Sequence, residues 1–215
     1  SGSALPVSGW QMGLSNPRVE YAGVTSATTP ICLFAVFRPT TVGFNWDSLV
    51  DTAGNTTTEG LILYQTTSNA TTPGLYSHSA GGSFDLPAGI LTVNRWFAVA
   101  MMKRAVGDWF GAIRDFQTGV LTTGTSANAA SHEEVDGTTV RVGNSSFVGE
   151  EADAGIAMAG FTRSRLTNQQ LTDWVLNPWN VLDQQASIGS VLSGASDLSW
   201  LPSFSGGTGS RTVVV

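Results

Sequence analysis

The sequence is poor in charge and has almost no lysine. Charged residues make up 12% of its 215 residues, the formal net charge is −6, and Lys103 is the only lysine. Proteins that bind nucleic-acid backbones or anionic membrane surfaces need clustered Lys and Arg side chains. The composition therefore predicts neither a nucleic-acid partner nor a membrane partner.

Cysteine and long apolar runs are also scarce. Cys32 stands alone, which excludes a scaffold held by internal disulfides. Its surroundings, "ICLFAVF", predict a buried and inert thiol. No stretch reaches the roughly 18–20 apolar residues of a membrane helix. The first ten residues show no signal peptide, although a mature chain would look the same.

What the sequence does have is many short apolar runs separated by Gly, Ser, Thr and Asn. Apolar residues make up 41% of the chain, and there are 25 glycines. Such runs between turn-forming residues are typical of strands buried between two layers. We predict strands at residues 18–24, 31–38, 48–52, 60–66, 74–79, 95–103, 108–115, 138–143 and 155–163. Their number and spacing predict an all-β sandwich or jelly roll of two antiparallel sheets.

One short helix is predicted near the end of this β-rich region, in "LTNQQLTDWVLNPWNVL". Thr167 is a good N-cap, and Gln170 three residues later completes a capping box. Leu166 and Leu171 flank the cap and can form a hydrophobic staple. These signals place the start of the helix at Thr167.

The same segment predicts where the helix packs and where it ends. Leu171, Trp174 and Val175 share one face at helical spacing. Pro178 disfavours helical backbone at the residue before it, so the helix should stop near Leu176. A helix of about two and a half turns is not stable alone. It should therefore lie against the sandwich.

The order of motifs resembles the laminin-G-like, concanavalin A-like domains. The chain reads "RWFAVAMM", "GDWFGAIRD", "TTVRVGN" and then "AGIAMAGFTRSRLTNQQL", with Arg165, Leu166 and Thr167 at the family positions that lead into a capped helix. The resemblance spans residues 15–182 and rests on packing and capping motifs. It implies a concanavalin A-like jelly-roll sandwich with one short C-terminal helix.

The ending "NPWNVL" is similar to laminin-G-like modules encoded by tailed bacteriophages and prophages. In that interpretation Trp179 folds back onto the sandwich after Pro178. The alternative is an ordinary helix stop followed by a core tryptophan.

The composition of the sequence changes after Asp183, where small residues separate scattered apolar ones. We assign residues 1–183 to the jelly-roll domain and residues 184–215 to an extension that docks on a partner or on its own chain. Apolar anchors separated by Ser and Gly are too many for a solvated linker. The predicted partner-binding residues are Trp10, Trp200, Phe204, Val213, Val214 and Val215. The three valines could add a strand to a sheet edge, more naturally that of a partner.

The concanavalin A-like class includes glycoside hydrolases, and its laminarinase-like members carry an E-x-D-x-x-E pattern on one strand. Glu134 and Asp136 fit the first two positions, but no third carboxylate follows. Glu151 and Asp153 form a second incomplete pair. A retaining hydrolase needs two carboxyl groups about 5–5.5 Å apart. The sequence therefore predicts no catalytic residues and no enzyme.

The resemblance also implies possible calcium, because such domains often bind it through loop oxygens. Glu134, Asp136, Glu151 and Asp153 are weak calcium candidates, and a solvated acidic rim is the preferred interpretation. No cofactor is otherwise predicted.

A glycan site needs exposed aromatic rings beside polar groups. Trp46 and Tyr76 adjoin turns and are the candidate glycan-binding residues. Trp96, Trp109 and Trp174 lie in core-like patterns and are predicted to pack.

Because one fold hosts many functions, the functional prediction rests on these sites. We predict a non-catalytic structural protein of a tailed-phage virion, either a head decoration (cement) protein or a fibre-tip component. Its expected partners are virion proteins such as the major capsid protein, and itself as a homo-oligomer. The alternative is a carbohydrate-binding, lectin-like module, secreted or at a cell surface, with a surface glycan as its partner.

Overall fold

The structure is a computed structural model. It describes residues 10–12, 19–22, 31–42, 46–52, 60–66, 72–77, 82–128, 139–145, 150–162 and 164–179. The tail after Asp183, with Trp200, Phe204 and Val213 to Val215, lies outside these residues, as do Glu134 and Asp136.

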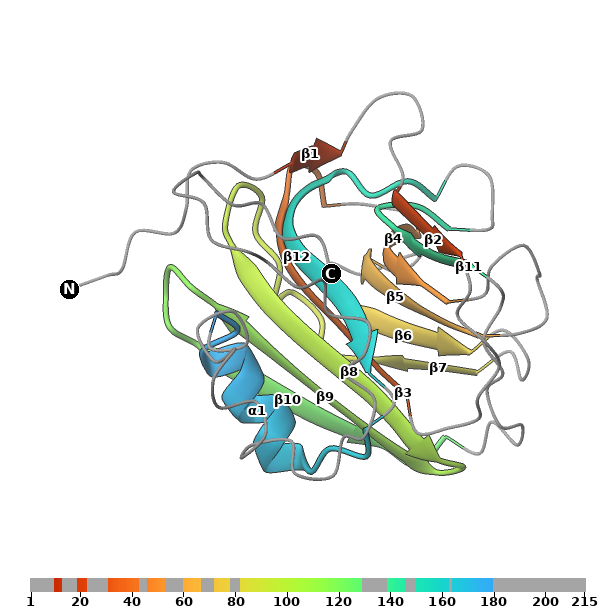
Figure 1. The fold of residues 1–215 in the computed structure, drawn as a ribbon. Helices are drawn as coiled ribbons and strands as arrows, with labels where there is room; N and C mark the ends of the chain where they lie inside the picture. The colour runs from red at the N-terminus through yellow and green to blue at the C-terminus, as the bar shows by residue number, and fades with distance from the viewer. Residues whose placement is uncertain are drawn as a thin grey trace, which may run out of the picture.

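The described strands form two six-stranded antiparallel sheets that face each other (Figure 1). In sheet order, the first sheet holds β1 (Trp10–Met12), β12 (Ala154–Thr162), β3 (Ile31–Pro39), β8 (Phe97–Ala105), β9 (Asp108–Asp115) and β10 (Leu121–Ser126). The second sheet holds β2 (Val19–Ala22), β11 (Thr139–Val142), β4 (Asp47–Asp51), β5 (Leu61–Thr66), β6 (Gly74–Ser77) and β7 (Gly82–Asp85).

All nine predicted strands are present, but three strands were missed. These are β1, β7 and β10, three of the four edge strands of the two described sheets; the fourth, β2, was predicted. An edge strand buries less of its surface, so it needs no apolar run. The side chains of β10 alternate between exposed and half-buried, and Phe84 is the one buried residue of β7. The prediction failed there because it relied on apolar runs.

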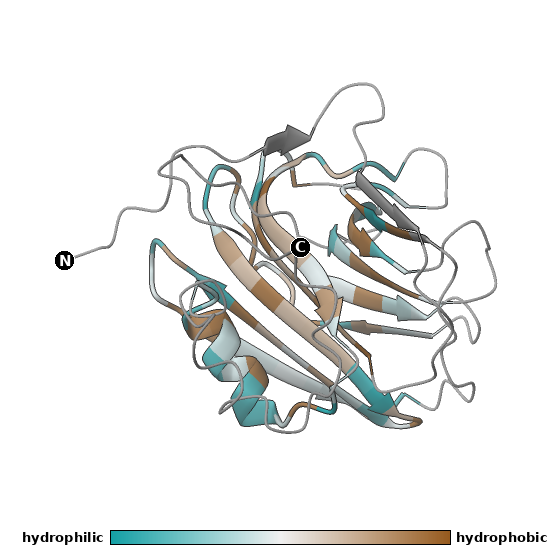
Figure 2. Cartoon of the chain, in the orientation of Figure 1, coloured by the Kyte–Doolittle hydropathy of each residue, from teal (hydrophilic) through white to brown (hydrophobic). Residues whose placement is uncertain are grey.

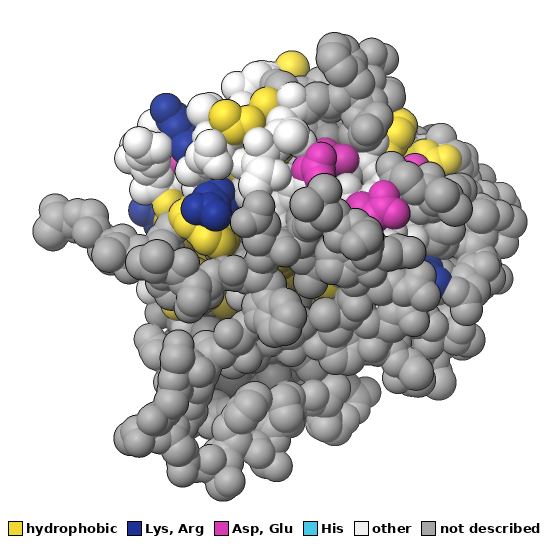
Figure 3. Space-filling model, turned by 90° about the horizontal axis from the view of Figure 1, so that it is seen from above, with side chains coloured by type: hydrophobic (Ala, Val, Ile, Leu, Met, Phe, Trp, Pro, Cys, Tyr) yellow, Lys and Arg dark blue, Asp and Glu magenta, His cyan; other side chains and the backbone are white. Residues whose placement is uncertain are grey.

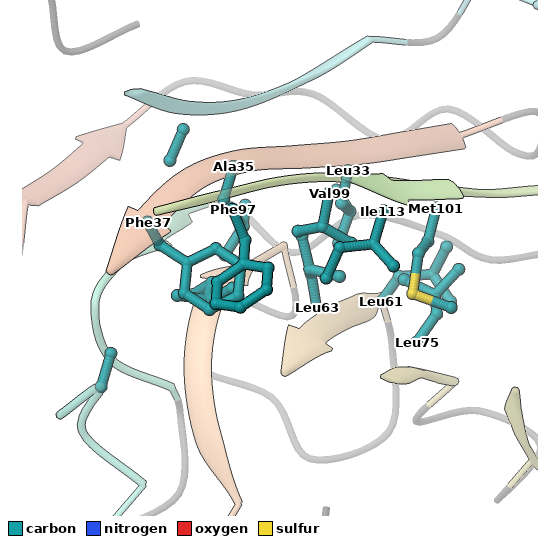
Figure 4. Packing of buried hydrophobic residues seen from close by; sticks show 14 of the residues in the cluster. Leu33, Ala35, Phe37, Leu61, Leu63, Leu75, Phe97, Val99, Met101 and Ile113 are labelled. Carbon is teal, nitrogen blue, oxygen red and sulfur yellow. The ribbon is translucent and has the colours of Figure 1, made fainter. Parts of the chain in front are cut away.

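The main core lies between the two sheets. Alternate residues of β3 and β8, such as Leu33 and Val99, point inward from the first sheet. Figure 4 shows these side chains meeting Leu61 and Leu63 of β5 and Leu75 of β6. All of these side chains are fully buried. This packing supplies most of the apolar burial that stabilises the fold.

The helix α1 (Asn168–Leu176) begins and ends as the sequence predicts. The backbone N–H of Gln170 donates to Thr167 Oγ1 at 3.2 Å, and the Thr167 N–H donates to Gln170 Oε1 at 2.8 Å. These two bonds form the predicted capping box. Leu171 and Val175 are fully buried. The helix prediction is therefore confirmed in its start, its end and its buried face.

The outer face of the first sheet carries a second apolar cluster, here called the outer cluster. Its buried members are Cys32, Val36, Ala98, Ala100, Met102, Phe110, Ala112, Met158, Leu171 and Val175. α1 lies along β8 and β9, and the Trp174 ring centroid is 4.8 Å from that of Phe34 on β3. Figure 2 shows that α1 mixes hydrophilic and hydrophobic residues, whereas most of β8 is apolar.

This second cluster explains why several strands read as continuous apolar runs. Residues of β3 and β8 are buried on both faces, inside by the second sheet and outside within the outer cluster. Cys32 is 1% exposed, and burial raises the pKa of its thiol, as expected of an inert cysteine. Trp179 is half-buried and packs against the same cluster, a contact that both interpretations of "NPWNVL" predict.

Candidate functional site

Three aromatic rings gather at one end of β4, β5 and β6 in the second sheet. The ring centroid of Trp46 is 4.9 Å from that of Tyr64 and 5.9 Å from that of Tyr76. The Tyr64 and Tyr76 centroids are 6.5 Å apart. The structure thus brings together Trp46 and Tyr76, the two glycan candidates of the sequence, and adds Tyr64. We call these three residues the aromatic cluster.

Strand alternation places this cluster on the outer face of the second sheet. Leu61 and Leu63 of β5 point into the core, so Tyr64 points the other way. Leu75 of β6 also points inward, which turns its neighbour Tyr76 outward. Tyr64 and Tyr76 are diagonal neighbours across the β5–β6 pair, a spacing within reach of aromatic side chains.

The three rings differ in exposure. Tyr64 is 2% exposed, whereas Trp46 and Tyr76 are half-buried. The buried ring supports the other two, which keep part of their surface accessible. Half-buried rings with a polar edge are suited to recognition, because they offer an apolar body and a hydrogen-bonding group at little entropic cost.

A carboxylate lies beside the cluster. The Tyr64 hydroxyl donates to Glu150 Oε2 at 3.0 Å, and the Ser145 hydroxyl donates to the same oxygen at 2.6 Å. The backbone N–H of Ser145 in turn donates to Asn144 Oδ1 at 2.6 Å. Glu150 is thus held in one orientation by side chains from β5 and from the segment that follows β11.

Burial dominates the electrostatics of this group. It raises the pKa of Glu150 above its ordinary value of 4.5, although the hydrogen bonds from Ser145 and Tyr64 act in the opposite direction. Burial, and the nearby Glu150, also raise the pKa of the Tyr64 hydroxyl. Tyr64 therefore stays protonated at neutral pH and acts as a donor.

A second carboxylate, Asp85, shares the outer face of the second sheet. Phe84 of β7 points into the core, so Ser83 and Asp85 point outward, and Ser83 is the partner of Tyr76 across the β6–β7 pair. Partial burial raises the pKa of Asp85. The face therefore combines aromatic rings, hydroxyl groups and carboxylates.

The tryptophans predicted to pack do so in the structure. Trp109 is 1% exposed, and its indole N–H donates to the Asn128 carbonyl at 3.1 Å. Trp96 and Trp174 pack against the outer cluster. Trp10 lies in β1, opposite Ile156 of β12, so the backbone at this partner-binding candidate is part of the first sheet.

The calcium candidates within the described residues have other contacts. Asp153 Oδ2 accepts a hydrogen bond from the Thr41 hydroxyl at 3.0 Å, and the backbone of Glu151 forms an isolated β-bridge with that of Ser48. In the part of the chain that the structure describes, no three His, Cys, Asp or Glu side chains are grouped to hold a metal ion. Glu134 and Asp136 lie outside that part.

Sequence reasoning missed Tyr64, Ser145 and Glu150. A signal for Tyr64 was present, since "LILYQ" puts Tyr64 on the side opposite Leu61 and Leu63. Glu150 precedes the calcium candidate Glu151 in the sequence, but no local pattern marks it as a partner of Tyr64. Its place beside Tyr64 depends on a contact between residues 86 positions apart.

On the face seen in Figure 3, the described charged side chains are few and are spread among neutral and apolar side chains. No helix among the described residues has the length and apolar character needed to cross a membrane.

The chain is similar to known proteins in its structure but has no match in the sequence comparisons. No protein-family model and no curated protein matches the chain. The enzymatically active domain of tailspike protein 2 from bacteriophage CBA120 superimposes with a TM-score of 0.55 at 20% identity, covering 79% of this chain and 27% of that one. The chain thus spans about a quarter of the tailspike structure.

Two further solved structures show a similar fold. The heptameric SAP-like pentraxin from Limulus polyphemus has a TM-score of 0.55 at 17% identity, covering 76% of this chain and 79% of that one. The LG1-3 region of the laminin α2 chain has a TM-score of 0.50 at 9% identity, covering 72% of this chain and 31% of that one. The chain has the concanavalin A-like, laminin-G-like jelly-roll fold that the sequence motifs predict.

Proposed function

We propose that this jelly roll is a non-catalytic carbohydrate-binding module and that the aromatic cluster is its binding surface. The observation that carries the proposal is the meeting of Trp46 and Tyr76, both half-buried, on one sheet face beside Glu150. Aromatic walls with a few fixed polar groups are the usual lining of small-ligand sites. A sugar ring has apolar C–H faces and a rim of hydroxyls, and it complements such a surface.

Each group has a distinct role in this proposal. Trp46 and Tyr76 stack against the sugar, and the buried Tyr64 holds their positions. Glu150 accepts hydrogen bonds from sugar hydroxyls, with its orientation set by Tyr64 and Ser145. A prearranged acceptor costs little ordering on binding.

The binding test is a glycan array followed by titration calorimetry on the best ligand. Trp46→Ala or Tyr76→Ala should weaken binding about 10- to 100-fold, since burying an aromatic ring contributes roughly 1.5–3 kcal/mol. Tyr76→Phe separates stacking from the hydroxyl. Val120→Ala is the control. Val120 is 58% exposed and lies in the connection between β9 and β10 of the first sheet, away from the aromatic cluster. Unchanged affinity in both ring variants would refute the site.

The module is proposed to bind without hydrolysing its ligand, and this needs a direct test because the similar tailspike domain is described as enzymatically active. Purified protein should release no reducing sugar from polysaccharides, and Glu134→Gln and Glu150→Gln should leave that baseline unchanged. Sustained release that disappears in either variant would establish catalysis instead.

A structural role in a tailed-phage virion is the second candidate. The fold likeness to a phage tailspike and the phage-like "NPWNVL" ending support it. The chain would then be a head decoration (cement) protein or a fibre-tip component, bound to virion proteins such as the major capsid protein or to copies of itself. Mass spectrometry of purified particles should find it in stoichiometric amounts. If the chain is absent from purified particles, the virion role is wrong and the secreted or cell-surface module remains.

A further inference from the structure

β10 is an edge strand of the first sheet, and its outer side has no strand partner within the described residues. With six residues it is longer than the other edge strands, since β2 and β7 have four residues each and β1 has three. Its sequence, LTTGTS, contains no charge and no proline, and its pairing with β9 has no bulge. Natural proteins commonly protect long edges with these features. β10 is therefore an edge that can accept a further strand.

Hydrogen bonds at both ends of β10 show which of its backbone groups face this outer side. The Asp115 N–H donates to the Val120 carbonyl at 3.0 Å, and the Gly107 N–H donates to the Asn128 carbonyl at 3.0 Å. In an antiparallel pair the N–H and C=O of one residue point to the same side, and successive residues point to opposite sides. The even-numbered residues of β10 therefore face β9. The backbone groups that face away from β9 belong to Leu121, Thr123 and Thr125.

The side chains of the same three residues are also accessible. Leu121 is 37% exposed, and Thr123 and Thr125 are exposed too, whereas the residues between them are half-buried. Val120, which adjoins the strand, is 58% exposed. A strand added at this edge would therefore meet open backbone groups and uncharged, largely β-branched side chains, which are well suited to pairing in a sheet.

We propose that β10 pairs with β10 of a second copy of this chain, antiparallel about a two-fold axis at Thr123. In this register Thr123 lies opposite its own copy, and Leu121 lies opposite Thr125 of the partner subunit. Each opposed pair can exchange both backbone hydrogen bonds, because all three residues present N–H and C=O to the shared edge. A two-fold dimer requires a surface that is complementary to itself, and this register provides it. The strand also brings no like charges together, although each chain has a net charge of −6.

The dimer joins the first sheets of both copies and leaves the aromatic clusters, which lie on the second sheets, available to ligands. A contact through one short strand per copy is small beside the roughly 1,200 Å² that a standard stable interface buries. The dimer should therefore be weak and reversible. Two linked copies of one binding surface can still bind a multivalent target more tightly than a single copy.

Cysteine cross-linking tests the register on the full chain. Thr123→Cys should form a disulfide-linked dimer under mild oxidation, because opposed Cα atoms in such a pair lie about 5.5 Å apart, within the range of a disulfide. Thr125→Cys is the matched control, since its own copy would lie about 14 Å away along the strand. Native Cys32 is 1% exposed and does not compete. Thr123→Cys should cross-link at least about 10-fold faster than Thr125→Cys, and equal rates would overturn the proposal. A mixture of Leu121→Cys and Thr125→Cys should cross-link again.

Sedimentation equilibrium measures the same association without an added thiol. The full chain should pass from monomer to dimer as its concentration rises, and Thr123→Lys should weaken the dimer at least about 10-fold by placing two like charges opposite each other. Thr92→Lys is the control, because Thr92 is exposed in a turn beside the end of β3, which β8 and β9 separate from β10. It should leave the association unchanged.

Three results would overturn the proposal: a full chain that stays monomeric at all concentrations, a dimer that Thr123→Lys leaves unchanged, or equal weakening by Thr123→Lys and Thr92→Lys. Neither measurement uses a glycan, so its outcome does not depend on the proposed function.

Discussion

Replacing Leu171 with alanine should destabilise the entire jelly roll. Leu171 is fully buried between α1 and the outer face of β8 and β9. A buried Leu→Ala change costs about 2–5 kcal/mol, the sum of lost transfer free energy and of the cavity that remains. α1 has nine residues, and a helix of this length is not stable without its contacts to the sheet. The loss should therefore appear in global unfolding.

The assay is thermal and urea denaturation, each followed by circular dichroism and tryptophan fluorescence. For a domain of this size each kcal/mol moves the melting temperature by about 2–4 °C. A shift of roughly 4–20 °C is therefore expected. Leu176→Ala is a matched control, since Leu176 belongs to the same helix but is 39% exposed. It should cost less than about 1 kcal/mol, as a surface change does.

The difference in unfolding free energy between Leu171→Ala and Leu176→Ala tests whether α1 stabilises the sandwich through its buried face. If Leu171→Ala and Leu176→Ala cost the same, α1 does not stabilise the sandwich through its buried face. If Leu171→Ala shifts only a minor transition and leaves the main one in place, α1 unfolds independently. Either result would contradict the packing described above.

Three further predictions test the cap, the core and the site. Thr167→Ala should cost about 1 kcal/mol of unfolding free energy by removing the capping box, and a loss below 0.2 kcal/mol in urea melts would contradict that role. Gly111→Ala should cost about 1–3 kcal/mol, because its new Cβ would lie 3.1 Å from Met101 Cε and from a ring carbon of Phe84; an unchanged melting temperature would show that these side chains can move aside. Glu150 binds its proton more tightly in the folded state, so its contribution to stability should fall as pH rises from 4.5 through its raised pKa. Urea melts across that range should show a flatter pH dependence for Glu150→Gln, and an unchanged slope would argue against the raised pKa.

Local sequence signals predicted the elements whose formation depends on nearby residues. The capping box of Thr167 and Gln170 and the stop at Pro178 were read directly, because each depends on contacts within a few positions. Apolar runs predicted nine strands, since burial on both faces leaves a strong compositional signal. The edge strands β1, β7 and β10 carry no such signal and were missed.

In the candidate site, too, local features were predicted from the sequence and contacts between distant residues were not. Local patterns in the sequence predicted that Trp46 and Tyr76 lie near turns and that Trp109 is buried. The contacts of Trp46 and Tyr76 with each other and with Tyr64, and the position of Glu150 beside them, were not predicted and arise from the packing of distant segments. Strand order sets these contacts, and it depends on the free energy of the entire packed sandwich. Local propensity therefore specifies which residues lie in strands, whereas the packing of the two sheets specifies which of them become neighbours.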